Sequence, residues 1–180
     1  CSRTSTKVTH QKLSLSSAKP APMQILTLAA AILCLGIGFS VLLANSRRPS
    51  NRAFAAFSLI LAAWLVCVFG TMVAGGARER GEYADLEFWL RANAVVASFA
   101  PWGIWLLKNA IVFPREKGKR AFLNSVPVLG ISVFLAGLCF SSSFVFPGTD
   151  PILRRGTAFF LHSSIGVVLY LITAIQIGRQ

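Results

Sequence analysis

The feature that most constrains this chain is a series of five long apolar stretches, at residues 23–44, 53–73, 88–113, 121–146 and 156–178. An α-helix rises about 1.5 Å per residue, so about twenty apolar residues cross the roughly 30 Å hydrocarbon core of a bilayer. A membrane β-barrel would instead show alternating segments of about ten residues. A signal peptide would explain only the first stretch. The sequence therefore predicts an all-α, polytopic membrane helix bundle with about five transmembrane helices, forming one domain over residues 23–180.

The charge composition supports a membrane location. Only 13% of the residues are charged, compared with about 25% in a typical soluble domain. The net charge of +12 raises the possibility of nucleic-acid binding, but all the basic residues except Arg91 and Lys108 lie outside the apolar stretches, in the tail and in the short segments that flank them. No basic stripe with interleaved aromatic residues accompanies them, as a nucleic-acid interface would require. We therefore expect the lipid bilayer, and no nucleic acid, as the partner of this chain.

Residues 1–22 differ from the rest of the chain. They are polar and basic and rich in Ser and Thr, a composition that buries no core and predicts disorder. The sequence begins with Cys1, whereas Met23 directly precedes the first apolar stretch. We expect Met23 to be the native start, and we expect the chain as written to be a fragment cut at both ends.

The charges between the apolar stretches predict an orientation. Residues 45–52 contain three arginines and no acid, and residues 114–120 contain four basic residues against one acid, whereas residues 74–87 contain four acids. Cytoplasmic segments carry the excess of Lys and Arg. The pattern predicts an N-terminus outside the cell and a C-terminus in the cytoplasm. The basic residues of the tail oppose this orientation, and the conflict disappears if the chain starts at Met23.

The sequence contains no recognisable catalytic or metal-binding motif. The apolar stretches hold no paired carboxylates, and no P-loop, HExxH or nucleophile elbow is present. Cys34, Cys67 and Cys139 lie within apolar stretches without metal-ligand spacing, and we interpret them as small packing residues. We expect no catalytic residue, no metal and no cofactor in this chain, and no enzymatic activity of its own.

Four polar residues within the apolar stretches are candidates for ligand binding: Arg91, Asn93, His162 and Ser163. Ionisable residues inside a membrane span are costly and often functional. For Arg91 and His162 we favour a structural alternative. Arg91 lies near a helix end and is one turn from Glu87, with which it can pair, and His162 can be a neutral side chain that bonds between helices.

Prolines lie within two of the predicted helices. Pro101 falls in the middle of the third stretch and Pro127 falls in the fourth. Proline removes a backbone donor and clashes with the preceding turn, so both positions predict kinks. A kink in the third helix is a candidate bistable element for signalling, although packing alone also explains prolines in membrane helices.

Residues 47–66 read RRPSNRAFAAFSLILAAWLV, with Asn51, Phe54 and Trp64 opening the second apolar stretch after a basic segment. Together with the FWLRAN segment and Pro101 of the third stretch, this pattern resembles the N-terminal seven-helix sensor region of bacterial membrane histidine kinases. A similar module precedes some diguanylate cyclases. The resemblance implies two further helices, a cytoplasmic output domain and a homodimer formed through that output region, all outside this chain.

The leading hypothesis from the sequence is the membrane-embedded sensory region of a bacterial signalling protein, with a sensor histidine kinase as the expected output. A fragment of a secondary transporter is the first alternative. An integral membrane enzyme that uses His162 with Ser163 or Ser164 is the second. The sequence does not identify the stimulus.

Overall fold

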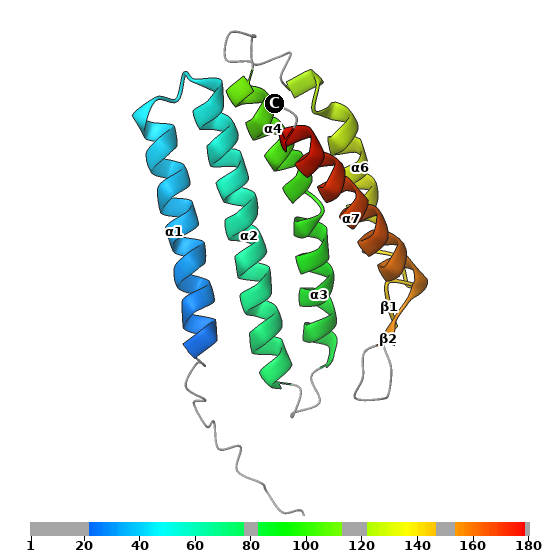
Figure 1. Cartoon of the computed structure of the whole chain (residues 1–180). Coiled ribbons are helices and arrows are strands. Elements are labelled where there is room, and N and C mark those ends of the chain that lie inside the picture. The colour runs from blue at the N-terminus through cyan, green and yellow to red at the C-terminus, as the bar shows by residue number, and fades with distance from the viewer. Residues whose placement is uncertain (1–21, 78–82, 113–121, 147–153, 179–180) are drawn as a thin grey trace, which may run out of the picture.

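The computed structural model describes residues 22–77, 83–112, 122–146 and 154–178. The elements in chain order are α1 (Pro22–Ala44), α2 (Pro49–Ala77), α3 (Tyr83–Ala97), α4 (Ala100–Val112), α6 (Val126–Leu138), β1 (Val145–Phe146), β2 (Arg154–Arg155) and α7 (Thr157–Gly178). Helices α1, α2 and the α3–α4 pair stand side by side, and α6 and α7 lie against the α3–α4 side (Figure 1). The predicted disordered tail lies outside the described residues, apart from Pro22, which begins α1.

The described part of the chain has four helical segments long and apolar enough to cross a membrane: Pro22–Ala44, Pro49–Ala77, Leu86–Val112 and Thr157–Gln176. Their outward surfaces carry large apolar side chains, such as Leu33, Phe39, Leu59 and Val167, each more than half exposed. A soluble monomer does not expose continuous apolar surfaces of this extent. The prediction of an all-α membrane helix bundle is confirmed, with β1 and β2 adding only a two-residue antiparallel ribbon.

Helices α1 and α2 form a tightly closed hairpin. The Asn51 side-chain amide donates hydrogen bonds to the carbonyls of Val41 and Asn45, each at 3.0 Å. It thereby satisfies carbonyls that the end of α1 leaves unpaired. Near the same end, a Cβ on Gly38 would lie 2.6 Å from the Ser58 Cβ, so the two helices approach closely only because position 38 has no side chain.

Helix α2 is the central helix, and it buries mostly small residues against its neighbours: Ala53, Ser58, Ala62, Cys67, Gly70, Ala74 and Ala77. The Trp89 ring of α3 packs directly against Gly70. Gly103 of α4 lies against Phe57 of α2, where an added Cβ would be 2.9 Å from the ring. Small residues at helix contacts let membrane helices approach closely enough for dispersion forces to hold them together.

The third apolar stretch is interrupted by a two-residue turn, called the break below, across which backbone hydrogen bonds continue from Phe99 N–H to the Val96 carbonyl at 3.1 Å and from Gly103 N–H to the Phe99 carbonyl at 3.0 Å. Helix α3 ends at Ala97 and α4 begins at Ala100, with Ser98 and Phe99 forming a turn between them. Pro101 was predicted to kink the helix, and the break lies just before it. Proline has no N–H to donate, and its ring clashes with the carbonyl four residues earlier, which here belongs to Ala97.

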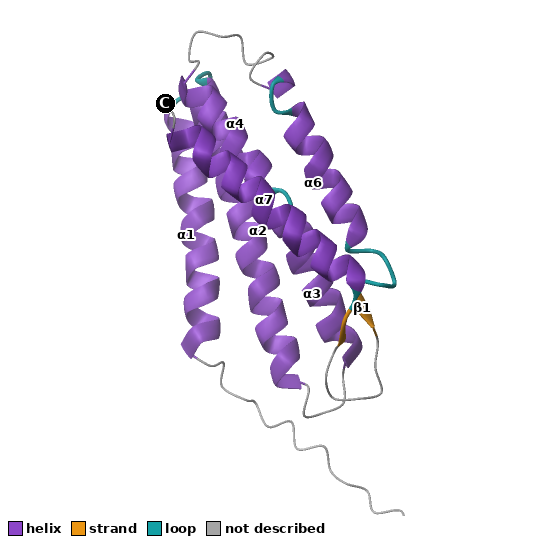
Figure 2. Ribbon diagram, turned by 45° about the vertical axis from the view of Figure 1, so that its right-hand side comes forward, coloured by secondary structure: helices purple, strands orange, loops and turns teal. Residues whose placement is uncertain are grey.

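The fourth apolar stretch forms a shorter helix than the predicted span of residues 121–146. Helix α6 covers only Val126–Leu138, with Pro127 in its first turn. After Cys139 the chain turns through Ser141 and Ser143, where the Ser143 N–H is bonded to the Ser141 hydroxyl at 3.2 Å. Serine side chains compete for backbone groups in this way and favour turns over helix. The chain then enters the β1–β2 ribbon, which leads into α7 (Figure 2).

Candidate functional site

Arg91 of α3 forms hydrogen bonds with the residues that follow the end of α6. Its Nε and Nη2 donate to Glu87 Oε1 at 3.0 and 2.7 Å, an ion pair across one helical turn. Nη1 donates to the carbonyls of Cys139 and Ser141 at 2.8 and 3.0 Å, and Nη2 also reaches the Val145 carbonyl at 3.3 Å. The predicted pairing with Glu87 is confirmed. All three guanidinium nitrogens donate to protein groups, and three of the acceptors are backbone carbonyls of residues that follow the end of α6.

Asn93 lies on α3, one turn before the break. Its Oδ1 is buried and has no hydrogen-bond partner among the described residues. Its side chain does not line the cavity described below. The structure therefore places Asn93 and Arg91 on the same helix as the candidate site but outside it.

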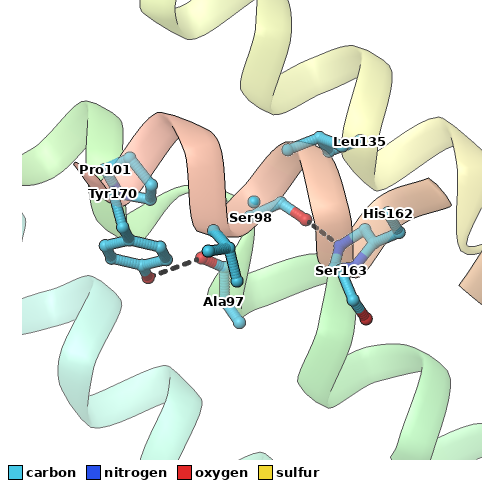
Figure 3. Close-up of a pocket in the computed structure, with 9 residues that line it drawn as sticks. Ala97, Ser98, Pro101, Leu135, His162, Ser163 and Tyr170 are labelled. Carbon is cyan, nitrogen blue, oxygen red and sulfur yellow. Dashed lines mark hydrogen bonds between the residues drawn. The ribbon is translucent and has the colours of Figure 1, made fainter. Parts of the chain in front are cut away.

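The break between α3 and α4 is joined to α7 by two hydrogen bonds (Figure 3). The Ser98 hydroxyl and His162 Nε2 are 2.9 Å apart. The same hydroxyl lies 2.8 Å from the Ala94 carbonyl, to which it donates. A hydroxyl has one proton, so His162 Nε2–H is the donor that completes this chain of bonds.

The second hydrogen bond is made to the backbone carbonyl that has no helical N–H donor because of Pro101. The Tyr170 hydroxyl donates to the Ala97 carbonyl at 3.4 Å. In an uninterrupted helix that carbonyl would accept from the N–H of the residue at position 101, and Pro101 has none. A residue on α7 thus replaces the backbone bond that α3 and α4 lack.

The two hydrogen bonds lie beside a cavity of about 240 Å³ between α3, α4, α6 and α7. His162, Ser163 and Tyr170 line it from α7, Ser98 and Pro101 line it from the break, and Leu135 lines it from α6 (Figure 3). Phe144 packs edge-on against His162 with ring centroids 5.6 Å apart. The result is a mostly apolar chamber with a few hydroxyl and imidazole groups, the usual character of a small-molecule site.

Two of the four ligand-binding candidates, His162 and Ser163, therefore lie at this cavity. Sequence reasoning missed Ser98 and Tyr170. A role for a residue such as Tyr170 could have been predicted from Pro101. A proline within a span leaves one backbone carbonyl without its N–H donor, and a polar side chain on a neighbouring helix can replace that donor. Ser98 had no such signal, because its contact with His162 joins residues 64 positions apart.

The neighbouring core contains further polar atoms without partners among the described residues. Ser132 Oγ, Trp105 Nε1 and Asn109 Nδ2 are buried and form no hydrogen bond there, and Ser132 is completely inaccessible. Unpaired polar groups are costly in an apolar interior. In the described part of the chain, no three metal-ligating side chains come together.

No protein-family model, curated protein or solved structure gave a significant match to this chain. The resemblance to histidine-kinase sensor regions therefore stays a prediction.

The role of Tyr170 can be tested with a double-mutant cycle. We expect Tyr170→Phe to lower the free energy of unfolding by about 0.5–1 kcal/mol, because the Ala97 carbonyl loses its donor. In a Pro101→Ala background the backbone N–H can serve that carbonyl, so Tyr170→Phe should then have almost no effect. Unfolding in SDS, followed by circular dichroism, measures both differences. Equal losses in the two backgrounds would show that the Tyr170 hydroxyl has no link to Pro101.

Proposed function

We propose that this chain is the membrane-embedded signal-input region of a signalling protein, with the α3–α4 break and its cavity as the responsive element. The observation that supports this proposal is the pair of hydrogen bonds, from His162 to Ser98 and from Tyr170 to Ala97, that join the interrupted span to α7. The turn weakens the backbone ladder, because the Ala97 carbonyl lacks its usual N–H donor and the Phe99 N–H bonds three residues back, to Val96, at 3.1 Å. Such an interruption allows α3 and α4 to change their relative tilt. The position of α7 then depends on that tilt.

The mechanism would be a shift between two helix packings. A ligand that enters the cavity and bonds to His162 or Ser98 competes with the bond between them. By linkage, it moves the equilibrium only as far as it prefers one packing over the other. A cavity of about 240 Å³ with an apolar lining suits a small apolar molecule carrying one hydrogen-bonding group.

The proposal includes a place and an orientation. The excess of basic residues at 45–52 and 114–120 favours a cytoplasmic location for those segments, in a bacterial inner membrane. In that orientation α7 ends at the cytoplasmic face. A shift of α7 would then reach a cytoplasmic output region, of which a histidine kinase dimer is the leading candidate and a diguanylate cyclase the second.

Phosphorylation of the full-length gene product tests this proposal. In proteoliposomes supplied with labelled ATP, we expect autophosphorylation, and we expect Ser98→Ala and His162→Phe to change its rate several-fold. Gly130→Ala, on α6 at a position with open space around it and outside the cavity lining, serves as the control and should leave the rate unchanged. Autophosphorylation of residues 1–180 alone, or a full-length rate that no cavity variant alters, would contradict the proposal.

One observation favours a second candidate, a secondary transporter. Transporters bind substrates where membrane helices are interrupted near the midplane, and the third span here is interrupted at Ser98–Phe99. Solute uptake by the full-length protein in vesicles, without phosphorylation or nucleotide turnover, would support this candidate and exclude the first.

A further inference from the structure

A second cavity lies at the opposite end of the bundle from the start of α3, beside the loop between α1 and α2. It has a volume of about 430 Å³. Arg47 and Arg52 line it, and both residues are exposed. We propose that this cavity binds the headgroup phosphate of an anionic phospholipid. The inference goes beyond the proposed signalling function and does not depend on it.

The two guanidinium groups are available to an anion. Arg52 Nε donates to the Ser46 carbonyl at 2.6 Å, which fixes the side chain. Among the described residues, its terminal nitrogens have no partner, and neither has the side chain of Arg47. Guanidinium groups donate in a fork that matches phosphate oxygens.

Acidic residues do not compete for these arginines within the described part of the chain. The acidic residues in the described ranges are Asp85 and Glu87. Both are in the first turns of α3, which begins at the other end of the bundle (Figure 1). Residues 45–52 themselves contain three arginines and no acid. The electrostatic potential at this end therefore favours a negative ligand.

The remainder of the cavity is apolar, and this distinguishes a lipid from a free anion. Ala56 of α2, Leu106 and Ala110 of α4, and Phe122 line it next to the arginines. An inorganic phosphate would gain nothing from such a wall, whereas a phospholipid places an acyl chain directly below its headgroup. The site also lies where α1 ends and α2 begins, the level at which headgroups meet a membrane helix. Basic pockets between helices at this level bind anionic lipid headgroups.

Native mass spectrometry of the full chain, titrated in neutral detergent, tests the assignment. Phosphatidylglycerol should bind more tightly than phosphatidylcholine. Arg47→Gln and Arg52→Gln should each weaken phosphatidylglycerol binding about fivefold, since a basic residue near an anionic headgroup contributes about 1 kcal/mol. Arg48→Gln removes the same charge from the same loop at a residue that does not line the cavity, and it should leave binding unchanged.

A second variant fills the cavity with a large side chain and leaves every charge in place. Ala56→Phe should reduce phosphatidylglycerol binding as strongly as Arg52→Gln, with helicity retained by circular dichroism. Equal weakening by all three arginine variants would show a diffuse charge effect and overturn the proposal. Equal binding of the two lipids, or displacement of phosphatidylglycerol by millimolar inorganic phosphate, would also overturn it, the latter in favour of a free-anion site.

Discussion

Replacing Arg91 with Ala is expected to lower the free energy of unfolding by about 2–3 kcal/mol, less than the roughly 3–5 kcal/mol of a fully buried pair because the Arg91 and Glu87 side chains are 19% and 24% exposed. The side chain makes five hydrogen bonds, three of them to the carbonyls of Cys139, Ser141 and Val145. Without it, the Cys139 and Val145 carbonyls and the Glu87 carboxylate lose the donor that Arg91 supplies, whereas the Ser141 carbonyl still accepts from the Phe144 N–H at 3.1 Å. SDS unfolding monitored by circular dichroism provides the measurement.

Arg155→Ala is the matched control for Arg91→Ala. Arg155 lies on the α6–α7 connection that Arg91 contacts, but it is exposed and its guanidinium carbon lies 4.8 Å from the centre of the Phe159 ring. Its removal should cost less than about 1 kcal/mol. Arg91→Lys should fall between the two, because an ammonium cannot reach carbonyls and carboxylate together. Equal effects of Arg91→Ala and Arg155→Ala would mean that Arg91 does not hold the end of α6.

Gly70→Val is expected to destabilise the bundle by about 3 kcal/mol, at the upper end of the usual cost of overpacking a core. A Cβ at this position would overlap the fused ring of Trp89 from α3. The ring itself packs edge-on against Phe88, with centroids 5.4 Å apart. Relief of the clash therefore requires α3 to move away from α2. Gly70→Ala should destabilise in the same direction by about 1–2 kcal/mol.

The control for Gly70 lies on the same helix. Nothing lies within 4 Å of a Cβ built on Gly75, so Gly75→Ala should only lower the entropy of the unfolded chain. We expect it to be neutral or to stabilise by up to about 1 kcal/mol. The two Gly→Ala variants should therefore differ in sign. Stabilisation by both would show that α2 and α3 do not pack at Gly70.

The sequence was sufficient to predict the elements whose signal is local. The charge-free stretches at 23–44 and 53–73 predicted α1 and α2. A segment of that length in hydrocarbon must satisfy its own backbone hydrogen bonds, and an α-helix does so. The Glu87–Arg91 pair followed from its spacing of one helical turn. Pro101 indicated an interruption of the third span, and the structure places it in a two-residue turn at Ser98–Phe99.

The end of α6 could not be predicted in this way. Phe140, Phe144 and Val145 keep the fourth stretch apolar beyond the last helical residue, Leu138. Hydropathy reports how a segment partitions into lipid, and it does not report whether an apolar segment is helix or turn. The helix ends where Arg91 takes the carbonyl of Cys139, a contact between residues 48 positions apart. The candidate site depends on similar long-range contacts, from α7 to Ser98 and Ala97.

The central claim is that α7 has two packings against the α3–α4 break, and a distance across the break tests it most directly. Spin labels at Phe88 and Ile175, both more than half exposed, would report the tilt of α3 relative to α7 by double electron–electron resonance, with the native cysteines replaced by Ala. Ser98→Ala combined with Tyr170→Phe removes both hydrogen bonds at the break. The account predicts that this double variant populates a second distance, absent or minor in the parent protein. One unchanged distance distribution in the two proteins would contradict it.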